Sequence, residues 1–397
     1  MVTISRVTGI PKTMRAVVYR GVNDLRLETV PVPRIGPGEL LVRVAVCGVC
    51  PTDIKKIHYG TVPPPRIFGH ETAGTIVKIG GGVGGRPQGL LASRFKTGDR
   101  VALHHHVPCL DCHFCRHRAF AQCATYKRTG ITAGFEPAGG GYAEYVRVMN
   151  FVLPGVVKIP AKNSFAEGAM LEPVNTVLKA VKRLNLLPGD TVLVAGQGPI
   201  GLMFTRLLKI AGIKVLATDL LASRLKLAKK FGAHRTCLAS QVSSLVTRHA
   251  SPLDAAIIAV PSDAAVQQAL QLVRGGGQVV LFAHTKRAVV CSLSARRPGG
   301  EGRGEVGTLN SQLSTLNFPL DPASICVDEK DLIGSYSADF TLQREVARLV
   351  FSRQLDMRGL ITHSFPLEQT AAAIELASRP TPDSLKILVN VGADKIS

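Results

Sequence analysis

Short runs of alternating hydrophobic and polar residues dominate the first part of the chain, up to about residue 170. Residues 14–19, 25–32, 40–46 and 72–79 are rich in Val, Leu, Ile and Thr, and glycines and prolines separate them. Runs of this length and composition, bounded by turn-forming residues, are typical of β-strands. The pattern predicts that this part of the chain is β-rich.

The pattern changes near Asp190, where apolar runs begin to alternate with amphipathic helices. Residues 191–195 form a buried-strand run, and a helix follows from about Pro199, a residue tolerated in a first helical turn. One face of this helix holds Ile200, Met203, Phe204, Leu207, Leu208 and Ala211. Further strands are expected at 214–219, 255–260 and 278–283, with helices at 223–233 and 264–273. This alternation predicts a doubly wound parallel sheet, the Rossmann-type α/β fold.

A glycine-rich turn, VLVAGQGPIG, joins the first of these strands to its helix. Gly196, Gly198 and Gly201 have the G-x-G-x-x-G spacing that lets a backbone approach a pyrophosphate at a helix N-terminus. Asp219 ends the next strand, where its carboxylate can accept hydrogen bonds from a ribose 2′-OH and would repel a 2′-phosphate. This favours NAD over NADP. Arg224 keeps the alternative open, because an arginine nearby could pair with that phosphate.

Four of the nine cysteines lie within fifteen residues, in the segment HVPCLDCHFCRHRAFAQC. Their spacing is C-x2-C-x2-C-x7-C, formed by Cys109, Cys112, Cys115 and Cys123. Four thiolates so arranged can surround one tetrahedral Zn²⁺ in a closed structural site. Clustered cysteines in a reducing compartment are more often metal ligands or catalytic groups than disulfides, and the odd total also argues against full pairing.

A second, dispersed set consists of Cys50, His70, Glu71 and Glu172. Thiolate, imidazole and carboxylate groups are suitable zinc ligands, and a catalytic site leaves one position for water or substrate. Spacing alone does not join these residues. His70 could equally lie in a turn, and Glu172 could cap the helix that follows it.

Composition narrows the class of protein. The chain has a formal charge of +20, from 48 basic and 28 acidic residues. The basic residues are scattered and aromatic residues are only 5%, which argues against a nucleic-acid partner and for a solvated basic surface that attracts an anionic cofactor. We find no secretory signal and no apolar run long enough for a membrane helix, so a cytoplasmic protein is expected.

With the glycine turn, Asp219 and the four-cysteine segment in one chain, the sequence resembles the zinc-dependent medium-chain alcohol dehydrogenases. Within them it is similar to the sorbitol, L-iditol and threonine dehydrogenase branch. The segments that carry the resemblance are CGVCPTDIKKIHYG, PPPRIFGHETAG, HVPCLDCHFC, GGGYAEYVRV, LEPVNTVLKAV, GQGPIGL and LITHSFPLEQTAAAIELA. They span most of the chain from Met14 to Gly392, apart from two insertions.

The resemblance implies two zinc ions per chain, one catalytic and one structural. Cys50, which precedes PTD, and His70 match the catalytic-zinc ligands. Glu71 and Glu172 stand where the family places carboxylates that bind zinc directly or through water. Glu172 replaces the cysteine of the liver-type enzymes, which is what indicates the polyol branch. The four clustered cysteines match the structural-zinc lobe, residues 104–128.

The resemblance also assigns roles around the catalytic zinc. Asp53 matches a residue that orients the His70 ring, and Thr52 matches the hydroxyl that passes the substrate proton outward. Many relatives end this relay with a histidine, and here Lys55 takes that place. A lysine could relay protons only if its pKa were lowered.

The implied reaction is hydride transfer from a secondary alcohol, a polyol such as sorbitol or L-iditol, to NAD. Thr176 and Ile200 match positions beside the nicotinamide, and Gly196, Gly198, Pro199 and Gly201 form the phosphate turn. Two alternatives within the same class are a threonine-type and a simple alcohol dehydrogenase. Alternatives of another class are a non-catalytic NAD-binding protein and a nucleic-acid-binding zinc protein.

The expected architecture has two parts with the active site in the cleft between them. A β-rich, GroES-like catalytic domain takes residues 1–173 and is completed by 336–397. A Rossmann-type NAD-binding domain takes residues 174–335 and carries a flexible insertion at about 288–317. The resemblance implies a homodimer or a homotetramer.

Overall fold

The computed structural model of the chain describes residues 9–81, 92–104, 107–128, 140–249, 253–283 and 321–392. The predicted insertion at 288–317 lies outside these residues. The strands are β1 (Thr13–Gly21), β2 (Asp24–Pro31), β3 (Leu40–Gly48), β4 (Arg66–Ile67), β5 (Glu71–Ile79), β6 (Arg100–Leu103), β7 (Tyr145–Val148), β8 (Val157–Lys158), β9 (Thr191–Ala195), β10 (Lys214–Asp219), β11 (Arg235–Leu238), β12 (Leu253–Ile258), β13 (Val273–Leu281), β14 (Asp331–Gly334), β15 (Ile361–Pro366) and β16 (Lys386–Asn390). The helices are α1 (Pro51–Tyr59), α2 (His113–Arg116), α3 (Ala124–Arg128), α4 (Phe165–Ala169), α5 (Leu171–Val181), α6 (Pro199–Ile210), α7 (Ala222–Phe231), α8 (Val242–His249), α9 (Asp263–Leu272), α10 (Pro322–Cys326), α11 (Gln343–Phe351) and α12 (Thr370–Ser378).

Two β-sheets form the part of the molecule that begins the chain. The larger sheet has the order β15-β16-β3-β5-β6-β8, with β7 also paired to β3, and the smaller sheet has the order β2-β1-β4. An isolated bridge between Ala16 of β1 and Ala143, just before β7, links the two. Strand β16 comes from far along the chain and pairs antiparallel with β3, so residues 386–390 complete a sheet begun by residues 40–48. The predicted β-rich character is confirmed.

The second part is a parallel sheet with the order β11-β10-β9-β12-β13-β14. The strand that comes first in sequence, β9, lies in the middle, so the order reverses between β9 and β12. Ligands of doubly wound sheets bind beyond the carboxyl ends of the strands at this reversal. The predicted Rossmann-type fold is confirmed.

Helix α6 presents its predicted apolar face to this sheet, with Met203, Phe204 and Leu208 fully buried. Ala211 is the exception to that prediction, because the helix ends at Ile210 and leaves Ala211 exposed as the residue that follows it. Strand β13 also begins earlier than the predicted residue 278, since Val273 pairs with Leu253 before an irregularity in the ladder.

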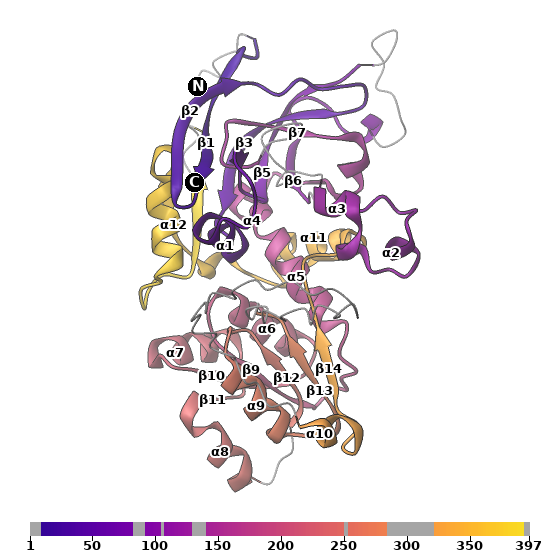
Figure 1. Ribbon diagram of the computed structural model, residues 1–397, viewed down its shortest axis with the longest axis vertical. Coiled ribbons are helices and arrows are strands. Elements are labelled where there is room, and N and C mark those ends of the chain that lie inside the picture. The colour runs from indigo at the N-terminus through magenta and orange to yellow at the C-terminus, as the bar shows by residue number, and fades with distance from the viewer. Residues whose placement is uncertain are drawn as a thin grey trace, which may run out of the picture.

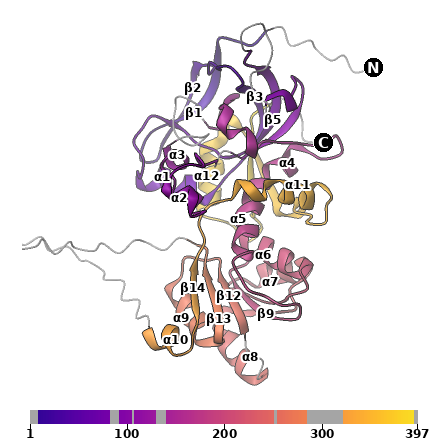
Figure 2. The ribbon, with the colours of Figure 1, turned by 90° about the vertical axis from the view of Figure 1, so that its right-hand side faces the viewer.

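A shared hydrophobic core joins the two parts. One cluster of buried residues includes Val46 and Leu388 from the larger β-sheet, Leu171 and Val174 from α5, and Val194 from the parallel sheet. Figure 1 shows the two parts stacked along the long axis with α5 and α6 between them. Figure 2 shows the chain leaving β14 and returning toward α11, so the chain crosses this junction a second time there.

Among the described residues, no helix combines the length and the apolar character needed to cross a membrane.

Candidate active site and metal centres

The four clustered cysteines converge around one point in the loop that carries α2 and α3. Their sulfur atoms all lie within 4.8 Å of one another. The Sγ–Sγ distance is 3.5 Å between Cys112 and Cys115, 3.6 Å between Cys123 and Cys109, and 3.9 Å between Cys109 and Cys115. A tetrahedral zinc with Zn–S bonds of about 2.3 Å needs sulfurs about 3.8 Å apart. The thiols are therefore spaced to fit such an ion, and they are too far apart to be disulfides.

Backbone amides support the negative charge that metal binding requires. The Cys112 N–H donates to Cys109 Sγ at 3.4 Å, and the Cys109 N–H donates to Cys123 Sγ at 3.5 Å. Burial raises the pKa of Cys123, but the N–H groups of Cys109 and Tyr126 outweigh it and bring that pKa to about 6. A lowered pKa favours the thiolate, the state in which a cysteine binds a metal.

The second group consists of Cys50, His70 and Glu71, whose ligand atoms also lie within 4.8 Å of one another. Cys50 directly precedes α1, while Glu71 opens β5 and His70 precedes it. His70 and Glu71 are buried, and Cys50 is partly exposed. This donor set of a thiol, an imidazole and a carboxylate, with Cys50 partly exposed, fits a catalytic zinc.

Asp53 fixes the orientation of the His70 ring. Its Oδ1 lies 3.2 Å from His70 Nδ1, and both side chains are buried. Burial lowers the pKa of His70, but the negative charges of Asp53 and Cys50 outweigh it and the pKa is raised. An environment that favours a proton on His70 in this way also favours a divalent cation in its place.

Glu71 forms a buried ion pair with Lys386, a residue at the start of β16. Lys386 Nζ donates to Glu71 Oε1 at 2.6 Å and to the Val49 carbonyl at 2.9 Å. Burial lowers the pKa of Lys386, but the Glu71 and Cys50 charges outweigh it and the pKa is raised. The cluster therefore contains a fixed positive charge beside its carboxylate.

Glu172 lies on α5 at the junction, outside the three-residue group. Its carboxyl group is buried, and burial together with the Glu71 charge raises its pKa to about 7, against the opposing effect of His70. Tyr336 lies in the segment after β14, and burial together with the Cys50 and Glu172 charges raises its pKa against the opposing effect of His70. The group of ionisable residues at the junction is thus larger than the four that the sequence singles out.

The glycine turn lies at the carboxyl end of β9, beside the reversal of strand order. Gly196 has φ of +92°, and a Cβ on Gly201 would lie 1.8 Å from the Gly196 carbonyl oxygen, so neither position accepts a side chain. A Cβ on Gly198 would meet nothing within 4 Å, which leaves this side of the turn open for a phosphate. Pro199 is the first residue of α6, and Ile200 follows it half-buried. The turn fits a dinucleotide pyrophosphate.

Asp219 lies beside this turn and holds it. Its carboxylate accepts hydrogen bonds from the Gln197 N–H at 2.7 Å and from the Leu221 N–H at 2.9 Å. Arg224 is buried instead, and its guanidinium donates to the backbone carbonyls of Thr381 and Ser384. Arg224 therefore contacts the loop before β16, and this contact occupies one of its terminal nitrogens.

Three further predicted residues lie on helices around the site. Thr52 is half-buried at the second position of α1, and Lys55 lies one turn further on. Burial lowers the pKa of Lys55 and the Cys50 charge opposes this, with a net lowering. Thr176 is half-buried on α5, and its hydroxyl donates to the Pro173 carbonyl at 2.8 Å.

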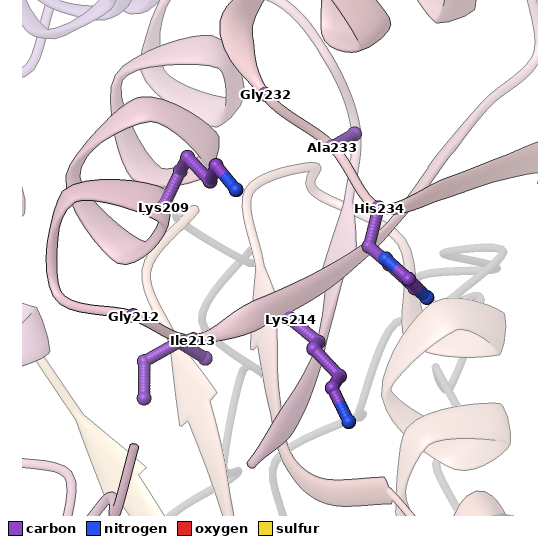
Figure 3. A pocket seen from close by; sticks show the side chains of 7 residues that line it. All are labelled: Lys209, Gly212, Ile213, Lys214, Gly232, Ala233 and His234. Atoms are coloured by element: carbon purple, nitrogen blue, oxygen red, sulfur yellow. The ribbon is translucent and has the colours of Figure 1, made fainter. Parts of the chain in front are cut away.

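A hollow of about 380 Å³ lies elsewhere on the parallel sheet. Figure 3 shows the residues that line it. Lys209, Lys214 and His234 line it, together with Gly212, Ile213, Gly232 and Ala233. The residues lie where α6 and α7 end and where β10 and β11 begin, the opposite edge from the glycine turn. Dinucleotides bind at the carboxyl ends of the strands, so this hollow is not the cofactor site. Its lysines complement the negative ends of the two helices.

Sequence reasoning missed Lys386, Tyr336 and Tyr126. Lys386 stands in a strand pattern, SLKILVN, and nothing nearby in the sequence indicates that its partner is 315 residues away. Tyr336 follows a strand without any motif of its own. The Tyr126 hydroxyl contacts Ser337, a residue 211 positions later. A single sequence carries no signal for pairs of this kind.

Comparisons with known proteins now identify the class. Residues 36–161 match the alcohol dehydrogenase GroES-like domain, and residues 199–300 match the zinc-binding dehydrogenase family. Sorbitol dehydrogenase of Gallus gallus is 30% identical over 379 residues, covering 92% of this chain and 93% of the relative. Sorbitol dehydrogenase of Bacillus subtilis is 29% identical over 394 residues, covering 96% and 98%.

The fold has a solved counterpart in an alcohol dehydrogenase of Escherichia coli CFT073 complexed with NADH. Its TM-score is 0.78 at 23% sequence identity, covering 96% of this chain and 100% of that one. Fold, glycine turn and metal-ligand clusters together define a nicotinamide-dependent zinc dehydrogenase. The chain belongs to the zinc-dependent medium-chain alcohol dehydrogenases, in the branch that contains the sorbitol dehydrogenases.

Proposed function

We propose that this chain oxidises a secondary hydroxyl of a polyol, such as sorbitol or L-iditol, and transfers the hydride to NAD⁺. The observation that carries the proposal is the convergence of Cys50, His70 and Glu71 within 4.8 Å of one another. The glycine turn and Asp219 support the choice of cofactor. Similarity to sorbitol dehydrogenases over nearly the full length supports the choice of substrate.

Cys50 and His70 would hold the catalytic zinc, with Glu71 and Glu172 as carboxylates that reach it directly or through water. When bound, the ion would act as a Lewis acid toward the substrate hydroxyl. Asp53 keeps His70 in one orientation, and Lys386 holds the Glu71 carboxylate in place. Preorganised charges of this kind need no rearrangement during the reaction.

Other residues of the chain would conduct the substrate proton outward and position the nicotinamide that accepts the hydride. We assign the outward path of the substrate proton to the Thr52 hydroxyl, with Lys55 as its exit, a role that the lowered pKa of Lys55 favours. Thr176 and Ile200 would flank the nicotinamide. Their positions on α5 and at the start of α6 put them at the junction of the two parts.

Cys109, Cys112, Cys115 and Cys123 would bind a second, structural zinc, as their spacing supports. For the cofactor, we propose NAD over NADP because Asp219 borders the turn and Arg224 is engaged with the loop before β16. Asp219→Ser should remove the repulsion of a 2′-phosphate. It should then lower the kcat/KM preference for NAD⁺ over NADP⁺ at least about tenfold.

The decisive experiment combines metal analysis with turnover. Zinc per chain is measured in wild type, in Cys50→Ala and in the matched control Cys112→Ala, and NADH formation is followed with sorbitol, L-iditol, xylitol, threonine and ethanol. We expect two zincs in wild type and one in each variant, with turnover of polyols abolished only by Cys50→Ala. An unchanged zinc content in Cys50→Ala, with no alcohol oxidised by wild type, would refute the proposal.

We also propose two domains, a catalytic domain of residues 1–173 with 336–397 and an NAD-binding domain of residues 174–335. The strand pairing supports this division, because β1–β8 with β15 and β16 form one part and β9–β14 form the other. We further propose a cytoplasmic homodimer or homotetramer, on the resemblance to the family. Sedimentation equilibrium on the purified protein distinguishes these two states from a monomer.

A further inference from the structure

The segment between β14 and α11 is bound tightly to α5, the helix that carries Glu172. Lys179 Nζ donates to the Tyr336 carbonyl at 2.8 Å. Asn175 donates to the Asp339 carbonyl at 2.9 Å and accepts from the Asp339 N–H at 2.8 Å. These bonds fix the backbone of residues 336–339 at the junction of the two parts, next to the catalytic cluster.

Within this segment, the Tyr336 backbone is bound to α5, the helix that carries Glu172, and Ser337 adopts an uncommon backbone conformation. The charges of His70, Cys50 and Glu172 act on the Tyr336 hydroxyl. Ser337 has φ of +61°, in the left-handed region that residues other than glycine rarely adopt. Such a conformation persists only where surrounding contacts enforce it.

One of these contacts comes from the four-cysteine lobe. Tyr126 on α3 donates its backbone N–H to the Cys123 sulfur, and its hydroxyl is hydrogen-bonded to Ser337 Oγ. The Tyr126 ring packs in the same small core as Cys115 and Cys123. A single buried residue therefore connects a proposed zinc ligand to the segment beside the catalytic cluster.

A second contact reinforces the first. The rings of Phe120, in the lobe, and Phe340, at the far end of the segment, meet edge to face with centroids 5.4 Å apart. The lobe thus contacts the segment on both sides of Asp339. Since the lobe is short and its own core is small, the positions of both rings depend on the cysteines being drawn together.

We propose that Tyr126 is a positioning residue for substrate binding. Through its bond to Ser337, the cysteine lobe with its metal bound fixes the neighbouring Tyr336, which we place at the substrate side of the catalytic site. The inference rests on the proposed function. It adds that the structural metal site acts on the alcohol KM, because the lobe contacts the segment at the junction through the Tyr126–Ser337 and Phe120–Phe340 pairs.

The test uses Tyr126→Phe, which removes the hydroxyl and keeps the ring packed, and Ser337→Ala, which removes the other half of the same bond. Tyr145→Phe is the matched control, because Tyr145 is a buried tyrosine of β7 in the same part of the molecule. Each variant is assayed for zinc per chain, for polyol KM and kcat, and for amide hydrogen exchange of residues 334–340.

We expect Tyr126→Phe and Ser337→Ala to raise the polyol KM about five- to thirtyfold, with kcat changed less than about twofold and full zinc content. Exchange of the 334–340 amides should be faster in both variants than in wild type and Tyr145→Phe. The double variant should resemble either single one, since both remove the same bond.

Unchanged KM and unchanged exchange in Ser337→Ala would overturn the inference, whatever Tyr126→Phe does. An equal fall in kcat for both variants and for Tyr145→Phe would also overturn it, because it indicates a general loss of structure. If wild type oxidises no alcohol but the 334–340 amides exchange faster in both variants, the connection between lobe and segment stands while the proposed function fails.

Discussion

At the scale of single residues, the buried pair of Lys386 and Glu71 fixes the charge beside the proposed zinc ligands. Both side chains are almost fully excluded from solvent, and Lys386 also bonds the Val49 carbonyl. Removing two charges from water is costly, and the mutual attraction offsets this only if both charges remain. The pair therefore makes the catalytic cluster sensitive to a residue that is not itself a proposed zinc ligand.

Lys386→Met should destabilise the fold by about 3–5 kcal/mol, because it leaves the Glu71 carboxylate buried without its partner. Glu71→Gln in the same chain should recover part of this loss. Urea unfolding at pH 7 measures both. Lys330→Met is the control, since Lys330 is buried but its partner Asp328 is half-exposed, and its effect should be clearly smaller. Equal losses for the two lysines would contradict the argument.

At the scale of elements, helix α4 begins with a capping motif whose glutamate also binds a distant part of the chain. Ser164 Oγ accepts from the Glu167 N–H at 3.1 Å, and Glu167 Oε2 accepts from the Ser164 N–H at 2.7 Å, a reciprocal capping box. The same carboxylate accepts from Asn163 Nδ2 at 2.9 Å and from Arg353 Nε at 3.2 Å. One glutamate thus caps α4 and ties it to the chain just after α11.

These bonds make part of the stability depend on pH. Burial raises the pKa of Glu167, but the bonds from Ser164, Asn163 and Arg353 outweigh it, so the pKa is lowered in the folded state. A lowered carboxyl pKa gives stability that is complete above the unfolded value, near 4.3, and is lost as the pH falls through the folded value.

Glu167→Gln should therefore cost about 1–3 kcal/mol at pH 7, and the difference from wild type should shrink below about pH 4. Urea unfolding of both proteins between pH 7 and pH 3 measures this. Glu368→Gln is a control, because the Arg15–Glu368 pair is exposed on both sides and is worth little. A difference that stays constant down to pH 3 would show that Glu167 acts only through packing.

At the scale of the whole molecule, the two parts share one hydrophobic cluster. On β16, Leu388 belongs to the cluster that also contains Val192 and Val194 of the parallel sheet, whereas its neighbour Val389 belongs to the cluster of the first part alone. Both side chains are fully buried. Successive residues of one strand thus face two different cores.

We expect Leu388→Ala to cost about 2–5 kcal/mol and to speed amide hydrogen exchange in β9 as well as in β3. Val389→Ala should speed exchange in β3 and leave β9 nearly unchanged. Exchange measured by mass spectrometry on both variants distinguishes the two. If β9 responds equally to both substitutions, the parts unfold as one unit and the shared cluster has no special role.

Whether the sequence predicts a given contact depends on how far apart the two contacting residues are along the chain. The parallel sheet, the α6 face and the close approach of the four cysteines come from periodicities and spacings of a few residues, and the structure contains them with the exception of Ala211 on α6. The convergence of Cys50, His70 and Glu71 could be expected only from the family resemblance, because spacing alone does not bring them together.

Contacts across long stretches of sequence could not be predicted at all. Lys386 and Glu71 are separated by 315 positions, and Tyr126 and Ser337 by 211. Lys386, Tyr126 and Ser337 stand in no motif, so nothing in one sequence identifies them as partners. The placement of Arg224 against the loop before β16 is of the same kind, since its neighbours in sequence indicate only a helix beside a cofactor turn.

The position of β16 bears on how the protein is made. The ribosome synthesises β3 and β5, with His70 and Glu71, long before β16, and the bond from Lys386 to the Val49 carbonyl spans 337 positions. During that interval the whole parallel sheet is translated, and it can fold first because its strands are contiguous in sequence. Until then, β3 lacks its pairing with β16, and Glu71 lacks its ion pair with Lys386. Completion of this sheet, and of the Lys386–Glu71 pair, is thus delayed until residues 386–390 have been synthesised.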